Sequence, residues 1–188
     1  MIPATTLILA LASAAFASPV SRATEDYMPL EISEMEMSCA KTAPADLLFA
    51  CTLNYNLRDP NAEAANPSVN PKVTCTHRWN WDGQTAEKGP LNTYTHSTLE
   101  CYSDGNGRNV KSSLYKFTGP ENIQLSFLSS YYKNYETKSF RNLFFEHVNI
   151  EALTPAEDSE LLKTWSLMQT QTFQDPSVTA YDPPTNSD

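Results

Sequence analysis

Glycine and histidine are scarce in this sequence, which has five glycines and three histidines among its 188 residues. It contains no glycine loop that can cradle a phosphate, and neither a Gly-x-Ser-x-Gly nor a His-Glu-x-x-His motif occurs. A zinc site needs ligands that converge, whereas His77, His96 and His147 are scattered along the chain. We therefore expect neither a metal ion nor a cofactor.

Positive charge is also in short supply, because 13 lysines and arginines stand against 22 aspartates and glutamates. The resulting net charge of −9 at pH 7 repels phosphate backbones and anionic lipids. After residue 17, no apolar run is long enough to cross a bilayer. Neither a nucleic acid nor a membrane is therefore an expected partner.

The first 17 residues carry no charged side chain, and their apolar run ends in the small-x-small pattern Ala15-Phe16-Ala17. This run is too short to span a bilayer, and the pattern predicts a secretory signal peptide over residues 1–17. The mature chain is then expected to be extracellular, to begin near Ser18, and to start with a flexible segment at 18–27.

The rest of the chain contains four cysteines, Cys39, Cys51, Cys75 and Cys101. An even number of cysteines in an exported protein indicates disulfides, and the absence of a Cys-x-x-Cys motif argues against a zinc or redox site. Two disulfides are therefore predicted, and at this point all three connectivities remain open.

Strict alternation over residues 47–57 is the clearest structural signal. Every second side chain there belongs to one largely apolar row: Leu47, Phe49, Cys51, Leu53, Tyr55 and Leu57. Because successive side chains of a strand point to opposite faces, this segment is predicted to be a half-buried strand. The same alternation recurs over 73–81, with a row made of Val73, Cys75, His77, Trp79 and Trp81.

Five further segments are predicted to be extended: 30–39, 93–101, 110–118, 122–131 and 140–150. In the first of them the apolar row changes phase near Ser33-Glu34, which predicts a β-bulge. The polar, proline-containing segment 58–72 is predicted to be an exposed loop. About seven strands with frequent turns predict a mainly β fold, an antiparallel β-sandwich or small β-barrel, over residues 28–153.

A different pattern follows this β region. Thr154-Pro155-Ala156-Glu157 has the form of a capping box with proline at the first helical position. Three apolar residues then follow at the spacing of one helix face: Leu161, Trp165 and Met168. A short C-terminal helix is therefore predicted over 154–173, followed by a disordered acidic tail over 174–188.

Only one grouping can be suggested for catalysis, and it consists of His77, Arg78 and Glu100. In a ribonuclease-like site, a carboxylate and a histidine exchange a proton while an arginine stabilises the charge of the phosphate. His77 and Arg78 are neighbours on one predicted strand, however, and therefore point to opposite faces. The favoured interpretation is a packed histidine with one hydrogen bond, and no catalytic residue is assigned.

Aromatic side chains are the candidates for ligand binding. Trp79 and Trp81 can form a stacking platform, but they share the inward row of their strand, so the core is their favoured location. Tyr132 and Tyr135 are better surface candidates, because alternation from Tyr131 leaves Tyr132 pointing outward. Tyr132 and Tyr135 are therefore the predicted binding aromatics.

The cysteines lie within four short stretches: Ile32-Ser33-Glu34-Met35-x-Met37-x-Cys39, Cys51-Thr-Leu-Asn-Tyr55-Asn-Leu57, Val73-Thr-Cys75 and Leu99-Glu-Cys101. This pattern, over roughly residues 28–150, resembles that of the fungal secreted proteins related to the Alternaria major allergen. The resemblance implies a disulfide-stabilised antiparallel β-barrel or sandwich, exported by a fungus. It also implies the pairs Cys39–Cys51 and Cys75–Cys101 and supplies no catalytic residues.

Some features depart from that family. Met35 stands where an aromatic residue is usual, segment 58–72 is a long insertion, and the predicted helix and tail lie outside the pattern. The additional cysteine of the allergen's covalent dimer is missing, so no covalent dimer is expected. We expect a secreted, non-enzymatic protein of allergen, elicitor or effector type that binds an unknown host or cell-wall ligand. A small ribonuclease-like hydrolase and a carbohydrate-binding module are the alternatives.

Overall fold

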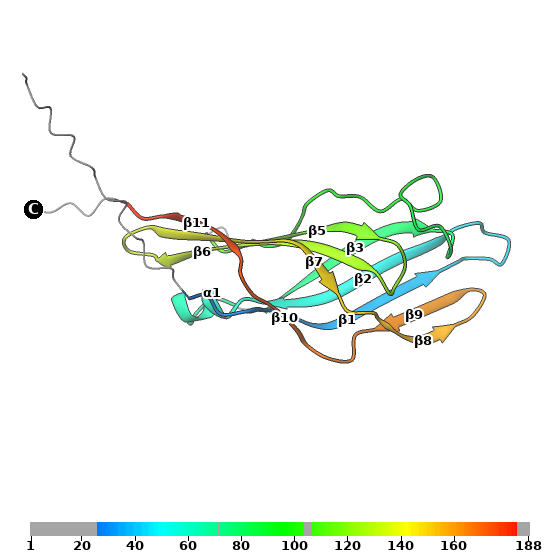
Figure 1. The fold of residues 1–188 in the computed structure, drawn as a ribbon, viewed down its shortest axis with the longest axis horizontal. Helices are drawn as coiled ribbons and strands as arrows, with labels where there is room; N and C mark the ends of the chain where they lie inside the picture. The colour runs from blue at the N-terminus through cyan, green and yellow to red at the C-terminus, as the bar shows by residue number, and fades with distance from the viewer. Residues whose placement is uncertain (1–25, 71, 104–106, 184–188) are drawn as a thin grey trace, which may run out of the picture.

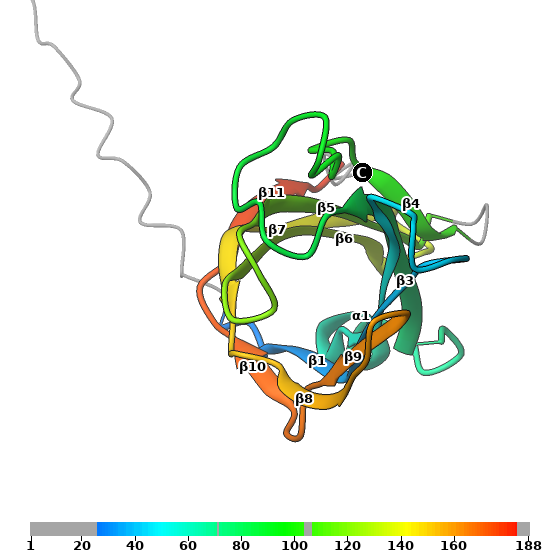
Figure 2. The ribbon, with the colours of Figure 1, turned by 90° about the vertical axis from the view of Figure 1, so that its right-hand side faces the viewer.

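A computed structural model describes residues 26–70, 72–103 and 107–183. The predicted signal peptide (1–17), nearly all of the predicted flexible segment (18–27) and the last five residues of the predicted tail lie outside the described residues. The described chain is mainly β, as predicted. Its strands pair into two separate antiparallel sheets and not into one closed barrel. The two sheets face each other across the interior of the domain (Figure 1, Figure 2).

The first sheet has the strand order β3-β2-β1-β9-β8, and β10 pairs with β1 as well. Its strands are β1 (Leu30–Ala40), β2 (Phe49–Arg58), β3 (Lys72–Trp81), β8 (Thr154–Asp158), β9 (Leu162–Ser166) and β10 (Gln171–Phe173). The predicted inward row of β2 is buried, although Leu47 is 80% exposed and precedes the strand. A register shift between Ser33 and Glu36 confirms the predicted bulge in β1.

The second sheet has the strand order β11-β7-β6-β5-β4. Its strands are β4 (Leu99–Ser103), β5 (Asn109–Phe117), β6 (Ile123–Asn134), β7 (Ser139–Ile150) and β11 (Ser177–Tyr181). The extended segment predicted over 93–101 is shorter than expected, because sheet pairing begins only at Leu99. Before it, Asn92 forms just an isolated bridge with Trp81.

The two sheets bury their apolar sides in one common core. The largest fully buried side chains come from both sheets: Tyr55, Phe117, Phe127, Ile32, Met35, Leu53, Leu114 and Leu125. The rings of Trp79 and Trp81 lie 4.9 and 5.1 Å from the ring of Phe117, centroid to centroid. Both tryptophans therefore belong to the core, which is the location that the sequence favours. Of the two predicted architectures, two separate sheets are compatible with the sandwich rather than with the barrel.

The C-terminal helix predicted over 154–173 is wrong, because this segment forms the β8–β9 hairpin and β10 (Figure 1). Strand β9 pairs with the edge of β1 and gives the backbone groups of that edge hydrogen-bond partners, which a packed helix cannot do. Trp165 is buried opposite Met37, whereas Met168 is 76% exposed, so no apolar helix face exists. Pro155 lacks an N–H and lies on the outermost strand, where prolines are tolerated.

The prediction of a disordered tail from residue 174 is also wrong for its described part, since β11 pairs with β7. Nη1 of Arg141 donates a hydrogen bond to Oδ1 of Asp182 at 2.7 Å and fastens the end of this strand. Composition missed the strand because backbone pairing along a sheet edge does not require an apolar sequence. The β domain therefore extends beyond the predicted boundary at residue 153. Strands β8, β9 and β10 belong to the first sheet, and β11 belongs to the second.

Segment 58–72 is not simply an exposed loop, because it contains the short helix α1 (Pro60–Ala65), on the left in Figure 1. Asp59 is the N-cap of α1 and accepts a hydrogen bond from Asn61 N at 2.9 Å, and proline begins the helix. Asp59 is fully buried, and Ala62 belongs to the core. Helix α1 thus covers one end of the sandwich, against β6.

Two disulfides are present, as the four cysteines predict, and the pairing is the one that the resemblance implies. Cys39–Cys51 joins β1 to β2, which are already neighbours in the first sheet. Cys75–Cys101 joins β3 of the first sheet to β4 of the second. Of the two disulfides, therefore, only the second joins one sheet to the other.

Candidate functional site

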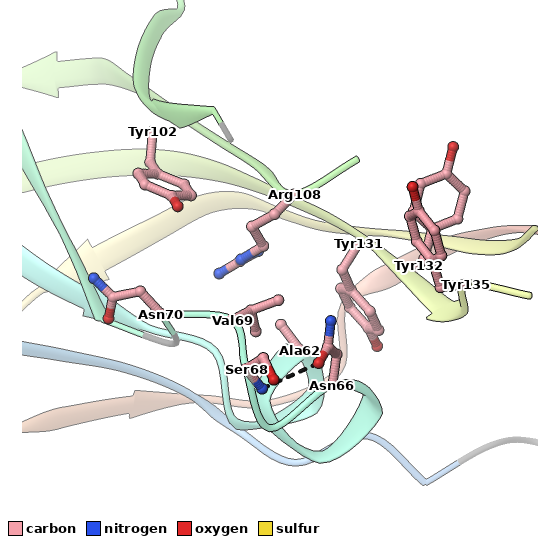
Figure 3. A pocket seen from close by; sticks show the side chains of 10 residues that line it. All are labelled: Ala62, Asn66, Ser68, Val69, Asn70, Tyr102, Arg108, Tyr131, Tyr132 and Tyr135. Carbon is pink, nitrogen blue, oxygen red and sulfur yellow. Dashed lines mark hydrogen bonds between the residues drawn. The ribbon is translucent and has the colours of Figure 1, made fainter. Parts of the chain in front are cut away.

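A cavity of about 250 Å³ lies beside α1, where three segments that are distant in the sequence meet (Figure 3). Helix α1 and the loop after it contribute Ala62, Asn66, Ser68, Val69 and Asn70. The second sheet and its turns contribute Tyr102, Arg108, Tyr131, Tyr132 and Tyr135. Because four tyrosines line it, we refer to this cavity as the tyrosine pocket.

The predicted binding aromatics, Tyr132 and Tyr135, both line the tyrosine pocket. Their ring centroids lie 5.3 Å apart in an edge-to-face arrangement, and Nζ of Lys138 lies 3.6 Å from the Tyr135 ring centroid. Tyr131 is buried and Tyr132 is partly exposed, as the alternation along β6 predicts. The end of β6 and the turn after it thus present two rings whose positions are fixed by aromatic and cation–π contacts.

Tyr132 packs directly on the backbone of Gly107, in the turn between β4 and β5. A Cβ atom on Gly107 would lie 2.1 Å from Cε2 of Tyr132, so a larger residue would displace the ring. The φ angle of Gly107 is +99°, a backbone conformation that glycine adopts readily and other residues rarely adopt. One of the few glycines in the chain therefore sets the position of a pocket wall.

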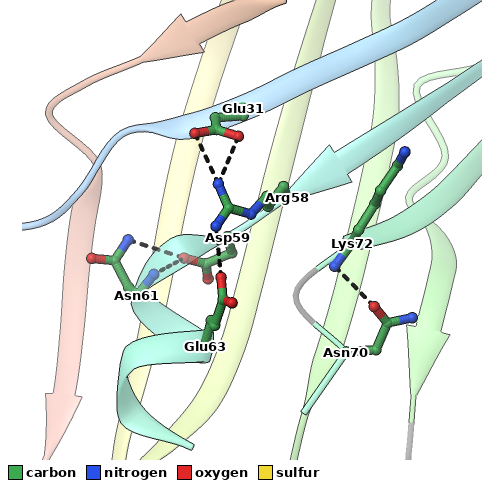
Figure 4. A network of polar contacts seen from close by, with 7 residues as sticks. All are labelled: Glu31, Arg58, Asp59, Asn61, Glu63, Asn70 and Lys72. Carbon is green, nitrogen blue, oxygen red and sulfur yellow. Dashed lines mark hydrogen bonds and ion pairs between the residues drawn. The ribbon is translucent and has the colours of Figure 1, made fainter. Parts of the chain in front are cut away.

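The asparagines after α1 offer hydrogen-bond donors. Oδ1 of Asn66 accepts a bond from Ser68 N at 3.0 Å, and Oδ1 of Asn70 accepts one from Lys72 N at 3.1 Å (Figure 3, Figure 4). Because a backbone N–H can only donate, its partner must be the carbonyl oxygen, and each Nδ2 amino group keeps its donors. In Figure 3 the amino group of Asn66 points up beside Tyr131 into the pocket.

A buried ion pair lies beneath the tyrosine pocket. Nη1 of Arg108 lies 3.8 Å from Oδ2 of Asp59, and the two side chains are 1% and 0% exposed. Ser129 joins them, because its hydroxyl donates to Asp59 Oδ2 and accepts from Arg108 Nη1. Since Asp59 also caps α1, one carboxylate fixes the helix, β6 and the arginine of the pocket.

An exposed ion pair network attaches the start of α1 to β1 on the outside (Figure 4). Nη2 of Arg58 donates to Oε2 of Glu63 at 2.7 Å, and Nη1 donates to Oε2 of Glu31 at 3.1 Å. The Arg58 side chain is 40% exposed, so each pair contributes little, about 0–1 kcal/mol. The buried pair below the pocket is therefore the main electrostatic anchor of this end.

A second cavity, of about 500 Å³, shares Tyr131 and α1 with the tyrosine pocket. We refer to it as the side cavity, and it is lined by Asp26, Tyr27, Met28, Asn61, Ala64, Ala65, Tyr131 and Lys133. A ligand longer than one ring can therefore contact both cavities across Tyr131. The combined space lies within the range of about 300–1,000 Å³ that is usual for ligand sites.

The residues of the suggested catalytic grouping do not meet. His77 is buried, and its Nε2 lies 3.1 Å from the Tyr55 hydroxyl and 3.1 Å from Ser112 Oγ. Arg78 points to the opposite, exposed face of β3, and Glu100 is exposed on β4 of the other sheet. The interpretation of His77 as a packed, hydrogen-bonded histidine is confirmed, and these three residues cannot line one catalytic site.

Burial lowers the pKa of His77 from 6.5 to about 4, so its imidazole is neutral in the folded protein at neutral pH. Between pH 6.5 and about 4 the unfolded chain binds a proton at this histidine that the folded chain does not bind. Stability therefore falls as the pH drops through this range. A shift of this size corresponds to about 3 kcal/mol, and above pH 6.5 the effect vanishes.

Replacing His77 with glutamine is expected to remove this part of the acid sensitivity. Urea unfolding at pH 7, 5.5 and 4 should show the free energies of unfolding of wild type and His77→Gln converging, or crossing, as the pH falls. His96→Gln is the matched control, because His96 is exposed. Parallel pH profiles for wild type and His77→Gln would contradict the burial of a neutral imidazole.

The two other histidines flank Tyr115. The ring of His147 stacks on Tyr115 with centroids 3.5 Å apart, and the His96 ring lies 5.3 Å from Tyr115. Among residues 26–70, 72–103 and 107–183, no three or more histidine, cysteine, aspartate or glutamate side chains are grouped to hold a metal ion. The described part of the chain also has no helix with the length and apolar character of a membrane span.

Sequence reasoning missed Arg108, Tyr102 and the two asparagines of the pocket. Asn66 and Asn70 both precede a proline, and this pattern is typical of turns in which the asparagine side chain bonds the backbone two residues on. That signal was available in the sequence. No local signal marks Arg108 as buried, because its partner Asp59 is distant in the chain.

No family model, curated protein or solved structure matches the chain.

Proposed function

We propose that this protein is secreted, is not an enzyme, and acts by binding a host or cell-wall ligand in the tyrosine pocket. The observation that carries the proposal is the convergence of Tyr102, Tyr131, Tyr132 and Tyr135 from two strands and a turn around one cavity. Tyrosine supplies a flat apolar ring and a polar hydroxyl, a combination that suits ligands with both apolar and polar surfaces. Arg108 and the loop asparagines add polar groups that fix orientation.

The non-enzymatic part of the proposal rests on the placement of the titratable groups. His77 is buried and neutral within the core, away from the pocket lining. The described residues that line the tyrosine pocket include no histidine, cysteine, aspartate or glutamate. Histidine and carboxylate side chains are the most common general acids and bases, so their absence from the described lining makes binding the better-supported function.

Secretion is supported by the two disulfides, which persist in oxidising compartments, and by the apolar N-terminal pattern ending at Ala15-Phe16-Ala17. An allergen, elicitor or effector role rests on the resemblance of the cysteine pattern alone. Under this proposal the first contact with the ligand is made at the pocket rim, by the exposed Tyr135 and the partly exposed Tyr132.

A retention assay on insoluble cell-wall material tests the proposal. The Tyr135→Ala variant is expected to be retained at least about fivefold less than wild type, because it loses a contact ring at the pocket rim. Tyr115→Ala is the control, since Tyr115 is 37% exposed but lies outside the pocket lining. Circular dichroism establishes that both variants are folded.

Equal retention of Tyr135→Ala and wild type would contradict the site. Release of sugar or RNA fragments by the purified protein, lost in a folded His77→Ala variant, would contradict the non-enzymatic proposal and support the hydrolase alternative.

A further inference from the structure

The strand orders of the two sheets end in β3 and β8 and in β11 and β4, and three of these strands carry features that hinder pairing with another chain. Strand β8 contains Pro155 and two acidic residues, which natural proteins use to protect a sheet edge. The disulfide Cys75–Cys101 ties β3 and β4 to each other. Strand β11 is different, because Ser177–Tyr181 contains neither a proline nor a charged side chain.

Strand β11 also has an open side. Among the described residues it pairs with β7 alone, so no strand lies along its other side (Figure 1). Its sequence, Ser-Val-Thr-Ala-Tyr, contains three residue types that favour strands. Val178, Tyr181 and the neighbouring Phe144 of β7 are exposed apolar side chains. An open edge of this composition is of the kind that accepts a further strand.

The sequence of β11 suits antiparallel pairing with a second copy of itself. When the pairing is centred on Thr179, this residue lies opposite the partner's Thr179, Val178 opposite the partner's Ala180, and Ser177 opposite the partner's Tyr181. Threonine pairs stabilise antiparallel sheets, and none of these pairs brings two like charges together. The strand is therefore complementary to itself, as a two-fold symmetric interface requires.

Prolines on both sides of β11 define the register of this pairing. Pro176 directly precedes the strand, and Pro183 follows it after Asp182. Because proline has no N–H to donate, the ladder cannot extend beyond these positions. The register centred on Thr179 pairs all five residues of the strand, and any shift leaves some of them without a partner.

From these observations we infer that the protein forms a non-covalent, two-fold symmetric homodimer, in which two β11 edges pair and join two sheets into one. The inference goes beyond the proposed binding function and does not depend on a ligand. On the outer face, Tyr181 lies beside Phe140 of its own chain and opposite the partner's Ser177, which in turn lies beside the partner's Phe144. Because serine is small, the Tyr181 ring can contact the partner's Phe144 across it. The dimer thus covers the exposed apolar side chains of this edge.

The net charge of −9 opposes association of two copies, but it does not act mainly at this edge. Residues 176–181 carry no charge, and Arg141 pairs with Asp182 at 2.7 Å. At physiological ionic strength, exposed charges more than about 8 Å apart are largely screened. A ladder of five residues makes an interface smaller than the usual size of about 1,200–2,000 Å². A weak dimer that is favoured by high protein concentration and by salt is therefore expected.

Sedimentation equilibrium of the oxidised protein, from about 1 to about 300 μM, tests the inference. Wild type is expected to reach the mass of a dimer at the upper concentrations. Thr179→Lys puts two like charges opposite each other in the dimer and should weaken association at least about tenfold. Thr154→Lys is the matched control, since Thr154 is exposed on the edge strand β8, and it should associate like wild type. Both substitutions make the net charge less negative, so a loss in Thr179→Lys alone cannot come from overall repulsion.

Cysteine cross-linking tests the register of the dimer. Residues directly opposite each other in an antiparallel pair have Cα atoms about 4.5–5.5 Å apart, which a disulfide can span. Thr179→Cys is therefore expected to give a disulfide-linked dimer on mild oxidation. Ser177→Cys is not, because the partner's Ser177 lies four residues farther along the strand, at about 13 Å. Electrophoresis without reductant distinguishes the two variants.

A monomer at every concentration, or a dimer that Thr179→Lys leaves intact, would overturn the inference. Cross-linking of Ser177→Cys as efficient as that of Thr179→Cys would overturn the antiparallel pairing about Thr179. These measurements involve neither the tyrosine pocket nor a ligand, so their failure leaves the proposed binding function to its own test with Tyr135→Ala.

Discussion

Removal of both disulfides is expected to lower the free energy of unfolding by about 6.5 kcal/mol. The bridges close loops with sequence separations of 12 and 26 residues. Restriction of the unfolded chain by loops of this size contributes about 3 and about 3.5 kcal/mol. Since a typical domain has a net stability of about 5–15 kcal/mol, the loss removes a large share of it. Urea unfolding of the oxidised and the reduced protein measures the difference.

The two bridges are expected to differ in their structural effect. Cys75–Cys101 connects the sheets, and Tyr102 of the pocket follows Cys101 directly. A Cys75→Ala/Cys101→Ala variant should therefore lose more stability than Cys39→Ala/Cys51→Ala, whose strands stay paired through the β1–β2 ladder. The opposite order, or an unchanged melting temperature in both, would contradict the role of the second bridge in holding the sheets together.

Replacement of Arg108 with methionine is expected to lower the free energy of unfolding by about 3–5 kcal/mol, because it leaves the Asp59 carboxylate buried without its counter-charge. Asp59 retains its bonds from Asn61 and Ser129, so the loss reports on the charge rather than on the helix cap. Chemical denaturation of the full chain measures this change.

Two further variants make the Arg108 result interpretable. Arg58→Met removes an arginine that is 40% exposed and should cost about 1 kcal/mol or less. Adding Asp59→Asn to Arg108→Met removes the stranded charge but keeps a side chain that can cap α1, so part of the stability should return. Equal losses for Arg108→Met and Arg58→Met, with no recovery in the double variant, would show that the buried pair is unimportant.

The strands that the sequence predicts best are those with one buried face. In β2 the inward row is apolar and the outward row polar, so a period of two residues identifies both the strand and its orientation. The same logic located the bulge of β1 and placed Tyr131 inside and Tyr132 outside. Burial of alternate side chains is a local property, and local patterns are sufficient to recognise it.

The start of a helix cannot be recognised from the sequence here, because a capping residue followed by proline occurs twice and leads once to a strand and once to a helix. Thr154-Pro155 opens strand β8, whereas Asp59-Pro60 opens helix α1. The difference lies in tertiary contacts. The edge of β1 recruits the C-terminal hairpin, and Ser129 and Arg108 hold the Asp59 carboxylate in the interior.

The residues of the candidate site also fall into those that a local sequence pattern indicates and those that only tertiary contacts bring together. Tyr132 and Tyr135 could be selected from the sequence because they are aromatic residues at exposed positions near a turn. Arg108 and Asn66 could not be associated with them, since these residues meet only when α1 packs against β6 and the β4–β5 turn. A pocket built from three distant segments has no local signature.

Hydrogen-exchange mass spectrometry of the secreted protein, with and without solubilised cell-wall polysaccharide, tests most directly whether the tyrosine pocket is the binding site. Amide exchange is expected to slow in peptides that cover residues 60–70 and 131–138, and to remain unchanged in the distant β8–β9 hairpin. Protection confined to other surfaces, such as that of Tyr115 and His147, would contradict the site. Unchanged exchange at saturating polysaccharide would contradict binding itself.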